Sequence, residues 1–256
     1  MLYQITSYFK FLLRSTNQHG VHSPFVFDLL TKCIYKKQDI PTALRAYRAQ
    51  FRNNIDTIEI TDFGTGSRVF NSNTRKIKDI AKHAGITQKR QRLLFKITQY
   101  LRVSEILELG TSLGLATSAL SLGNPDGHIT TVEGCPNTAV TAKEGFEAFQ
   151  LNNINLINLK FEDFFAAPNF QKKIDLVYID GNHSKENTLD YFNKLLPNVH
   201  NNTVLIFDDI YWSPAMTEAW NEIIAHPEIT VSIDSFYWGL VFFRKEQKKQ
   251  HFTLRL

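Results

Sequence analysis

The stretch "ILELGTSLG" at residues 106–114 decides the fold that the sequence predicts. A short apolar run ends at Glu108, and Gly110 and Gly114 frame the turn after it. In an open α/β sheet, a ligand binds beyond the carboxyl ends of the strands, where the first strand turns through glycines into a helix. An acid that ends the next strand can then bind a ribose diol. We expect that acid at Glu133, 25 residues after Glu108.

From residue 106 onward, short apolar runs alternate with segments of helical periodicity. The expected strands are "EILEL", "HITTVE", "INLINLKF", "IDLVYID" and "TVLIFDD". This alternation predicts a mostly parallel sheet with helices on both faces. Only a short turn separates "ITVSID" from "GLVFFR", so these two runs predict an antiparallel hairpin at the C-terminal edge.

Helical periodicity predominates before residue 104, and Ser23, Thr74 and, later, Ser213 stand where N-caps are expected. We therefore predict a helical N-terminal lobe over residues 1–103 and a second domain over residues 104–256. The lobe contains "DFGTGS" at 62–67, which also has two closely spaced glycines. No strand ending in an acid occurs within the next 25 residues, so we interpret this stretch as a turn of the lobe.

The composition, with 43% hydrophobic and 21% charged residues, is ordinary for a folded protein. No apolar run approaches the ~20 residues of a membrane span, and no secretory signal is evident. The two cysteines lack metal-type spacing and suit a reducing compartment, so we expect a cytoplasmic protein.

Charge is distributed unevenly along the chain. Residues 1–105 hold 18 Lys/Arg against 7 Asp/Glu, and the remainder holds 11 against 18. A basic half could meet an anionic substrate, a nucleic acid, an anionic membrane surface or the acidic half of its own chain.

Residues 104–244 resemble the class I S-adenosylmethionine-dependent methyltransferases, in the small-molecule O-methyltransferase group that includes catechol, caffeoyl-CoA and antibiotic-sugar enzymes. "ILELGTSLG" resembles the first motif of that family and "TTVEG" the second, and "FEDFF" resembles the adenine-side segment. "DLVYIDGNH" and "VLIFDDI" resemble the fourth- and fifth-strand segments. The resemblance implies a Rossmann-like, doubly wound, mostly parallel sheet of seven strands. It also implies that the N-terminal helices cover the substrate or form a homodimer.

S-adenosylmethionine is the cofactor that the resemblance implies, and its parts match particular residues. Gly110 and Gly114 would allow close backbone approach, Glu108 would lie near the aminoacyl part and Glu133 would accept the diol. By resemblance, Glu162 or Asp163 would face the adenine amino group. Thr111 and Asp180 complete the expected cofactor-binding set.

Three acids, Asp180, Asp208 and Asp209, come directly after strands that are expected to be neighbours. Crowded carboxylates favour a hard divalent cation, so we predict that they hold Mg²⁺ or a similar ion. Such an ion would lower the pKa of an acceptor hydroxyl. His183 lies three residues after Asp180 and could take the hydroxyl proton or bind the ion. We expect both His183 and Asp180 to be catalytic residues.

The expected function is O-methylation of a small hydroxylated acceptor, and whether this acceptor is anionic is left open. The alternatives are an RNA or protein methyltransferase that uses the basic half, a nucleotide-binding oxidoreductase and a noncatalytic binding module. Against a base methyltransferase, "DGNH" stands where a Pro-Pro turn is expected, and against an oxidoreductase, the first glycine turn lacks the G-x-G-x-x-G spacing. One further hypothesis is that "DFGTGS" with Arg68 forms a substrate-side loop for an anionic acceptor.

Overall fold

The computed structural model of the chain describes residues 2–64, 66, 70, 72–167 and 172–256. The chain divides into two compact units. The glycine-loop unit comprises residues 37–171, and the C-terminal unit comprises residues 1–36 and 172–256. The predicted helical lobe is therefore shared between the two units. Its predicted role, as a substrate lid or a dimer surface, stays a prediction.

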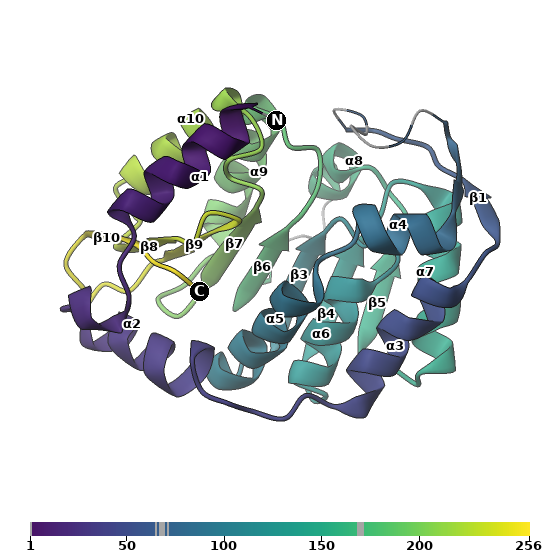
Figure 1. Cartoon of the computed structure of the whole chain (residues 1–256), viewed down its shortest axis with the longest axis horizontal. Coiled ribbons are helices and arrows are strands. Elements are labelled where there is room, and N and C mark those ends of the chain that lie inside the picture. Colours follow the sequence, from purple (N-terminus) through teal and green to yellow (C-terminus); the bar gives the residue numbers. More distant parts are fainter. Residues whose placement is uncertain (1, 65, 67–69, 71, 168–171) are drawn as a thin grey trace. The chain divides into compact units, whose positions relative to one another are not determined.

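The glycine-loop unit contains the parallel strands β3 (Glu105–Leu109), β4 (His128–Val132) and β5 (Ile154–Ile157), with β4 in the middle (Figure 1). Residues 106–109 of β3 are buried without alternation, as is typical of a parallel strand that is covered on both faces. A helix comes after each strand, which confirms the predicted alternation. These helices are α6 (Leu115–Gly123), α7 (Pro136–Ala148) and α8 (Phe161–Ala166).

The earlier part of this unit is helical, with one exception. Its helices are α3 (Thr42–Asn53), α4 (Ile77–His83) and α5 (Gln88–Leu101). The exception is an antiparallel pair, β1 (Thr57–Glu59) with β2 (Thr74–Lys76). The prediction of Thr74 as an N-cap is therefore wrong, because Thr74 lies in β2 and α4 begins only at Ile77. The backbone N–H groups of Ile77 and Lys78 instead donate to the carbonyls of Asp56 and Asn54, which replace a capping side chain.

The C-terminal unit contains the strands β6 (Leu176–Ile179), β7 (Val204–Asp208), β8 (Val231–Asp234), β9 (Trp238–Phe242) and β10 (Gln250–Thr253). They lie in the order β10-β8-β9-β7-β6 (Figure 1). β6 and β7 are parallel, whereas β9 runs antiparallel to both β7 and β8. The predicted class, a mostly parallel α/β sheet with an antiparallel C-terminal hairpin, is thus confirmed. The predicted count of seven strands is too low, because β10 adds in parallel to the outer side of β8.

Helices and their caps agree closely with the sequence signals in this unit. Its α-helices are α1 (Leu2–Arg14), α2 (Pro24–Asp28), α9 (Lys185–Leu195) and α10 (Pro214–Ala225). Ser23 and Ser213 accept the backbone N–H groups of Val26 and Met216, which confirms both predicted caps. Among the residues that the structure describes, no helix combines the length and the apolar character that crossing a membrane requires.

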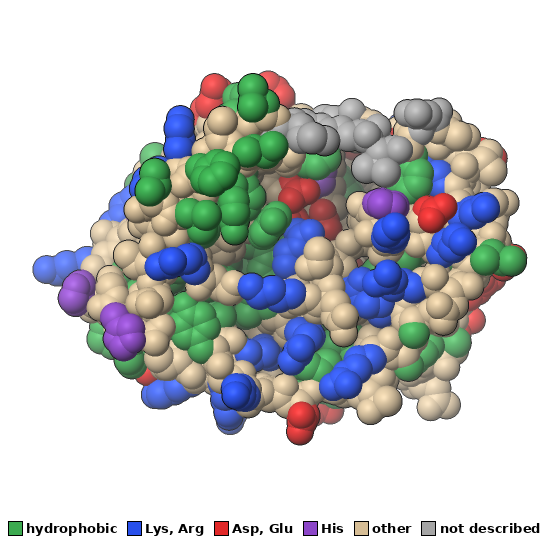
Figure 2. All heavy atoms as spheres, viewed as in Figure 1, with side chains coloured by type: hydrophobic (Ala, Val, Ile, Leu, Met, Phe, Trp, Pro, Cys, Tyr) green, Lys and Arg blue, Asp and Glu red, His purple; other side chains and the backbone are tan. Residues whose placement is uncertain are grey.

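One face of α1 packs inward through Phe11, while apolar side chains also cover its outer face. Leu2, Ile5, Phe9 and Leu13 are all exposed, and Leu13 is 88% exposed. Figure 2 shows hydrophobic side chains gathered over this helix. The outer face of a surface helix is normally polar, so exposed apolar side chains along α1 indicate an interaction surface.

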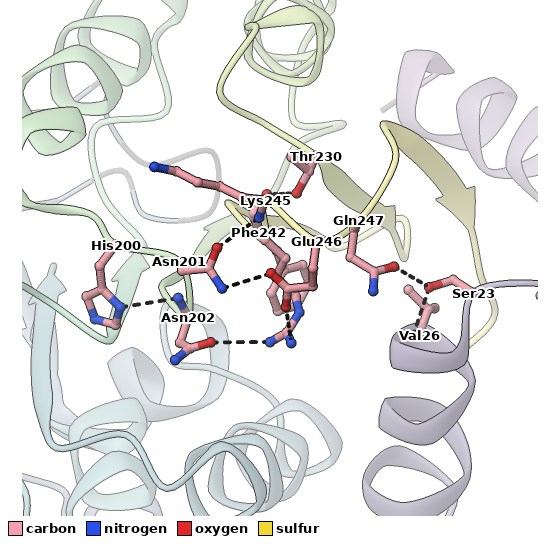
Figure 3. A network of polar contacts seen from close by, with 11 residues as sticks. Ser23, Val26, His200, Asn201, Asn202, Thr230, Phe242, Lys245, Glu246 and Gln247 are labelled. Atoms are coloured by element: carbon pink, nitrogen blue, oxygen red, sulfur yellow. Dashed lines mark hydrogen bonds and ion pairs between the residues drawn. The ribbon is translucent and has the colours of Figure 1, made fainter.

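The turn after β9 is held by side chains from two other parts of the C-terminal unit (Figure 3). The backbone N–H of Lys245 donates to Asn201 Oδ1 at 2.8 Å, and Asn201 Nδ2 donates to Glu246 Oε2 at 2.9 Å. Ser23 Oγ donates to Gln247 Oε1 at 3.2 Å. These contacts fix the turn from which the chain returns as β10.

Candidate active site

The glycine loop connects β3 to α6 through three left-handed residues. Gly110 has φ +105°, Ser112 +49° and Gly114 +70°. A Cβ on Gly114 would lie 2.4 Å from a ring carbon of Phe146 and 2.6 Å from the hydroxyl oxygen of Tyr47. Only glycine therefore fits this position without moving its neighbours. The start of α6 is therefore packed directly against Phe146 and Tyr47 on this side of the loop.

Glu108 lies beneath this loop and is completely buried. Its Oε2 accepts hydrogen bonds from Thr117 Oγ1 at 2.5 Å and from Thr131 Oγ1 at 2.6 Å. Its Oε1 is buried and has no hydrogen-bond partner. Burial raises the pKa of the Glu108 carboxyl to about 8, against the bonds from the two threonines, which lower it. The side chain is therefore mostly neutral at pH 7.

Glu133, directly after β4, joins the glycine loop to the next turn. Its Oε2 accepts the backbone N–H of Ser112 at 2.8 Å, and its Oε1 accepts the backbone N–H of Cys135 at 2.9 Å. Burial raises its pKa above the ordinary value, while the backbone hydrogen bonds lower it. A carboxylate offers about four lone-pair sites, so both oxygens keep capacity for hydroxyl donors such as a diol.

Thr111 and the two acids of α8 occupy different environments. Thr111 is buried, and its hydroxyl lies 2.6 Å from that of Thr131, whose own proton goes to Glu108. Thr111 therefore offers its backbone, not its hydroxyl, to a ligand. Glu162 and Asp163 lie in the first turn of α8 and are exposed. Their predicted adenine-side role stays a prediction.

In the C-terminal unit, a buried tyrosine brings two of the predicted acids together. Tyr178 Oη lies 2.6 Å from Asp208 Oδ2 and 3.3 Å from Asp180 Oδ2. Asp208 is 3% exposed, and its Oδ1 accepts the backbone N–H of Asp209 at 2.8 Å. The sequence analysis did not single out Tyr178. Its position in β6, two residues before Asp180, was the available signal.

His183 and Asp209 lie on turns beside these acids and have left-handed backbones, with φ +34° and +53°. Such values are uncommon for residues other than glycine and occur often at functional sites. His183 Nε2 lies 3.7 Å from Asp180 Oδ1, and the rings of His183 and Trp212 are 5.7 Å apart. The predicted pair of Asp180 and His183 is thus brought together.

The predicted metal ligands do not form a recognisable ion site. Within the described part of the chain, no group of three or more His, Cys, Asp or Glu side chains is arranged to hold a metal ion. Each oxygen of Asp208 already accepts a hydrogen bond, from Tyr178 and from the backbone of Asp209. A metal-binding role for Asp180, Asp208 and Asp209 stays a prediction.

The residues of the glycine-loop unit do fit the donor that the sequence predicts. The glycine loop has positive φ at Gly110 and Gly114, and among the described residues the buried Glu108 Oε1 has no hydrogen-bond partner. Glu133 lies at the end of the adjacent strand β4, where a ribose diol is expected. Thr117 and Thr131, which hold Glu108, were not predicted.

Comparisons with known proteins agree with this geometry. Residues 107–210 match a family model described as a methyltransferase domain. No curated protein matches the chain.

The fold is shared with several solved methyltransferases. The SAH-bound methyltransferase PaMTH1 of Podospora anserina is 16% identical, with a TM-score of 0.62 over 88% of this chain and 97% of that one. TomG of Streptomyces achromogenes, an O-methyltransferase of tomaymycin synthesis in complex with SAM, is 16% identical, with a TM-score of 0.58 over 86% and 95%. The Bacillus cereus O-methyltransferase in complex with SAH is 20% identical, with a TM-score of 0.53 over 61% and 82%. Residues 107–210 thus resemble a methyltransferase domain, and the chain shares the fold of these solved methyltransferases.

Proposed function

We propose that the protein transfers a methyl group from S-adenosylmethionine to a hydroxyl of a small acceptor. The observation that carries this proposal is the donor site of the glycine-loop unit, within the matched methyltransferase domain. There, the positive-φ glycine loop between β3 and α6, the buried Glu108 and the acid Glu133 lie at the carboxyl ends of the consecutive strands β3 and β4.

In this proposal the bound donor supplies an electrophilic methyl on a sulfonium. The backbone of residues 110–114 approaches the donor closely, and Glu133 accepts hydrogen bonds from the ribose diol. Glu108 lies completely buried beneath the loop, and we propose that it supports the loop where the aminoacyl part binds. Thr111 contributes its backbone groups. Glu162 or Asp163 accepts a hydrogen bond from the adenine amino group.

For the acceptor, we propose His183 as the general base and Asp180 as the group that orients it. In the tautomer whose Nε2–H faces Asp180, Nδ1 is the atom that accepts the acceptor's hydroxyl proton. The carboxylate of Asp180 would then stabilise the imidazolium that forms. A role for Asp180 in positioning the donor is compatible with this one.

The geometry supports a metal-assisted mechanism, with an ion held by Asp180, Asp208 and Asp209, less than it supports His183 as the base. Tyr178 brings Asp180 and Asp208 together, which favours a shared role. Among the described residues, no group of three or more candidate ligands is arranged around an ion, so no step is assigned to one.

An anionic acceptor is supported by charge alone. The basic excess of residues 1–105 gives an anionic molecule an attractive surface to approach. Arg68, the residue proposed to meet it, lies outside the described residues. To test this role, the KM for the acceptor and the Kd for the donor are measured in Arg68→Ala. The KM should rise relative to wild type, and the Kd should stay the same.

A homodimer through α1 is a further part of the proposal. The exposed apolar side chains of Leu2, Ile5, Phe9 and Leu13 would be buried by the same helix of a second copy. Light scattering should then give twice the 29.5 kDa of one chain. Phe9→Ser together with Leu13→Ser should halve that mass, whereas Lys10→Ser on the same helix should not.

The experiment that tests the proposed function is calorimetric titration with S-adenosylhomocysteine, in Mg²⁺ and then in EDTA. Equal binding in both supports a donor site that needs no metal. Mg²⁺-dependent binding or activity that Asp208→Ala abolishes would favour the metal version instead. Failure of the folded wild-type protein to bind would refute the methyltransferase proposal. Loss of turnover in His183→Gln with unchanged binding would support the assigned base.

A further inference from the structure

The "DFGTGS" stretch begins in a segment that is attached to the turn containing Glu133. We name residues 59–63 the anchored segment. The backbone N–H of Thr61 donates to Cys135 Sγ at 3.3 Å, and Asn137 Nδ2 donates to the carbonyl of Glu59 at 2.7 Å. These bonds join the end of β1 to the connection between β4 and α7. The anchored segment therefore lies beside the proposed diol acceptor.

Phe63 ends this segment, and its ring lies against Gly134. A Cβ built on Gly134 would be 2.8 Å from Phe63 Cδ2, closer than real side chains approach. The absence of a side chain at residue 134 thus makes room for an aromatic ring from another part of the chain. Phe63 is still 45% exposed, so much of its ring surface is uncovered.

Two side chains hold this arrangement in place. Asn158 Nδ2 donates to the carbonyls of Glu133 and Gly134, at 2.6 Å and 3.1 Å. Lys160 Nζ lies 4.7 Å from the centroid of the Phe63 ring, a distance typical of a cation–π contact. The turn and the ring are therefore fixed independently of any ligand.

A nucleoside whose diol meets Glu133 places its base next to the residues just after Glu133, because the base and the diol share one ribose ring. Gly134 has no side chain next to the expected position of the base, and the ring of Phe63 is the apolar surface that contacts Gly134. We propose that Phe63 forms an aromatic wall of the nucleoside pocket and stacks against the purine of the donor. This inference rests on the proposed function, because it uses Glu133 as the diol acceptor. It assigns the first part of "DFGTGS" to the donor side of the site.

The test is calorimetric titration of the full chain with two probes, S-adenosylhomocysteine and adenosine. Stacking of a base on an aromatic side chain implies that Phe63→Ala raises the Kd of both probes at least about fivefold. Phe63→Tyr, which keeps the ring, should bind within about twofold of wild type. Phe63→Leu keeps apolar volume without the ring and should behave like Phe63→Ala. Ile55→Ala, at a 70% exposed apolar residue of the same unit, is the matched control and should change nothing.

A double-mutant cycle separates stacking from a loosened fold. Gly134→Ala displaces the Phe63 ring and should weaken adenosine binding in the wild-type background, but much less in the Phe63→Ala background. Equal affinities of wild type, Phe63→Ala and Phe63→Leu would overturn this inference and leave the proposed function intact. Failure of the wild type to bind either probe would overturn the proposed function, and the inference with it.

Discussion

Replacing Glu108 by glutamine should change how the stability of the protein depends on pH. The carboxyl is completely buried, and its pKa is raised to about 8 by burial. Glutamine has the same shape, and its amide oxygen can still accept the hydrogen bonds from Thr117 and Thr131. The variant therefore removes the titration with little change in packing.

The sign of the effect is set by the proton that the folded state retains. In the unfolded chain the carboxyl returns to its ordinary pKa of 4.5, so the folded state binds this proton more tightly than the unfolded state does. The stability that this preference contributes is fully present below pH 4.5 and is lost as the pH rises to about 8. The loss is about 1.4 kcal/mol for each pH unit, or about 5 kcal/mol over the whole window. Above that window both states are ionised and the loss stops.

The assay is urea unfolding monitored by tryptophan fluorescence between about pH 5.5 and 8.5. The free energy of unfolding of Glu108→Gln should rise relative to wild type by about 1.4 kcal/mol per pH unit, up to about pH 8. Other buried acids such as Glu133 are present in both proteins, so their effects largely cancel. Glu144→Gln, an exposed residue of α7, should give a difference that does not change with pH. A flat difference for Glu108→Gln would refute the argument that burial keeps this carboxyl neutral.

Three further substitutions test other parts of the site. Tyr178→Phe removes the donor to the buried Asp208 and should lower the free energy of unfolding by about 2 kcal/mol in urea titrations, and an unchanged value would contradict the shared hydrogen bond. Gly114→Ala should lower the thermal midpoint more than Gly66→Ala does, because both glycines have positive φ but only Gly114 has neighbours within 4 Å. Glu133→Gln should raise the Kd of S-adenosylhomocysteine about tenfold or more at unchanged stoichiometry, and wild-type affinity would remove Glu133 from the diol site.

The order of strands and the acids at their ends could be predicted because both depend on local sequence. Short apolar runs that end in Glu108, Glu133, Asp180 and Asp208 form the strands that alternation predicts. The β8–β9 hairpin was predictable from the short turn between its runs. β10 could not be predicted in the same way, because "QHFT" is short and mostly polar and its pairing with β8 depends on distant contacts of the preceding turn.

The environment of Glu108 depends on register, which a single strand does not reveal. Glu108 pairs with Thr131 across β3 and β4, and Thr117 approaches from the first turns of α6. The family resemblance predicted that Glu108 lies near the aminoacyl part of the donor, which stays a prediction, but it did not show that the carboxyl is buried beneath the loop. Aligning "EILEL" with "HITTV" in parallel would have paired Glu108 with a threonine and supplied this signal.

The two glycine stretches differ in the strands and helices that surround them, not in their own residues. "ELGTSLG" continues into α6, and its backbone is held to β4, where the N–H of Gly110 donates to the carbonyl of Val132 at 2.9 Å. "DFGTGS" comes after β1, a short strand that pairs with β2 in a two-stranded antiparallel sheet and not, among the described residues, with a parallel strand. Its proposed link to the donor site rests on a long-range contact, that of Phe63 with Gly134, between residues that are distant in the chain. Local patterns predict elements and their ends, whereas a contact of this kind becomes evident only when the chain is folded.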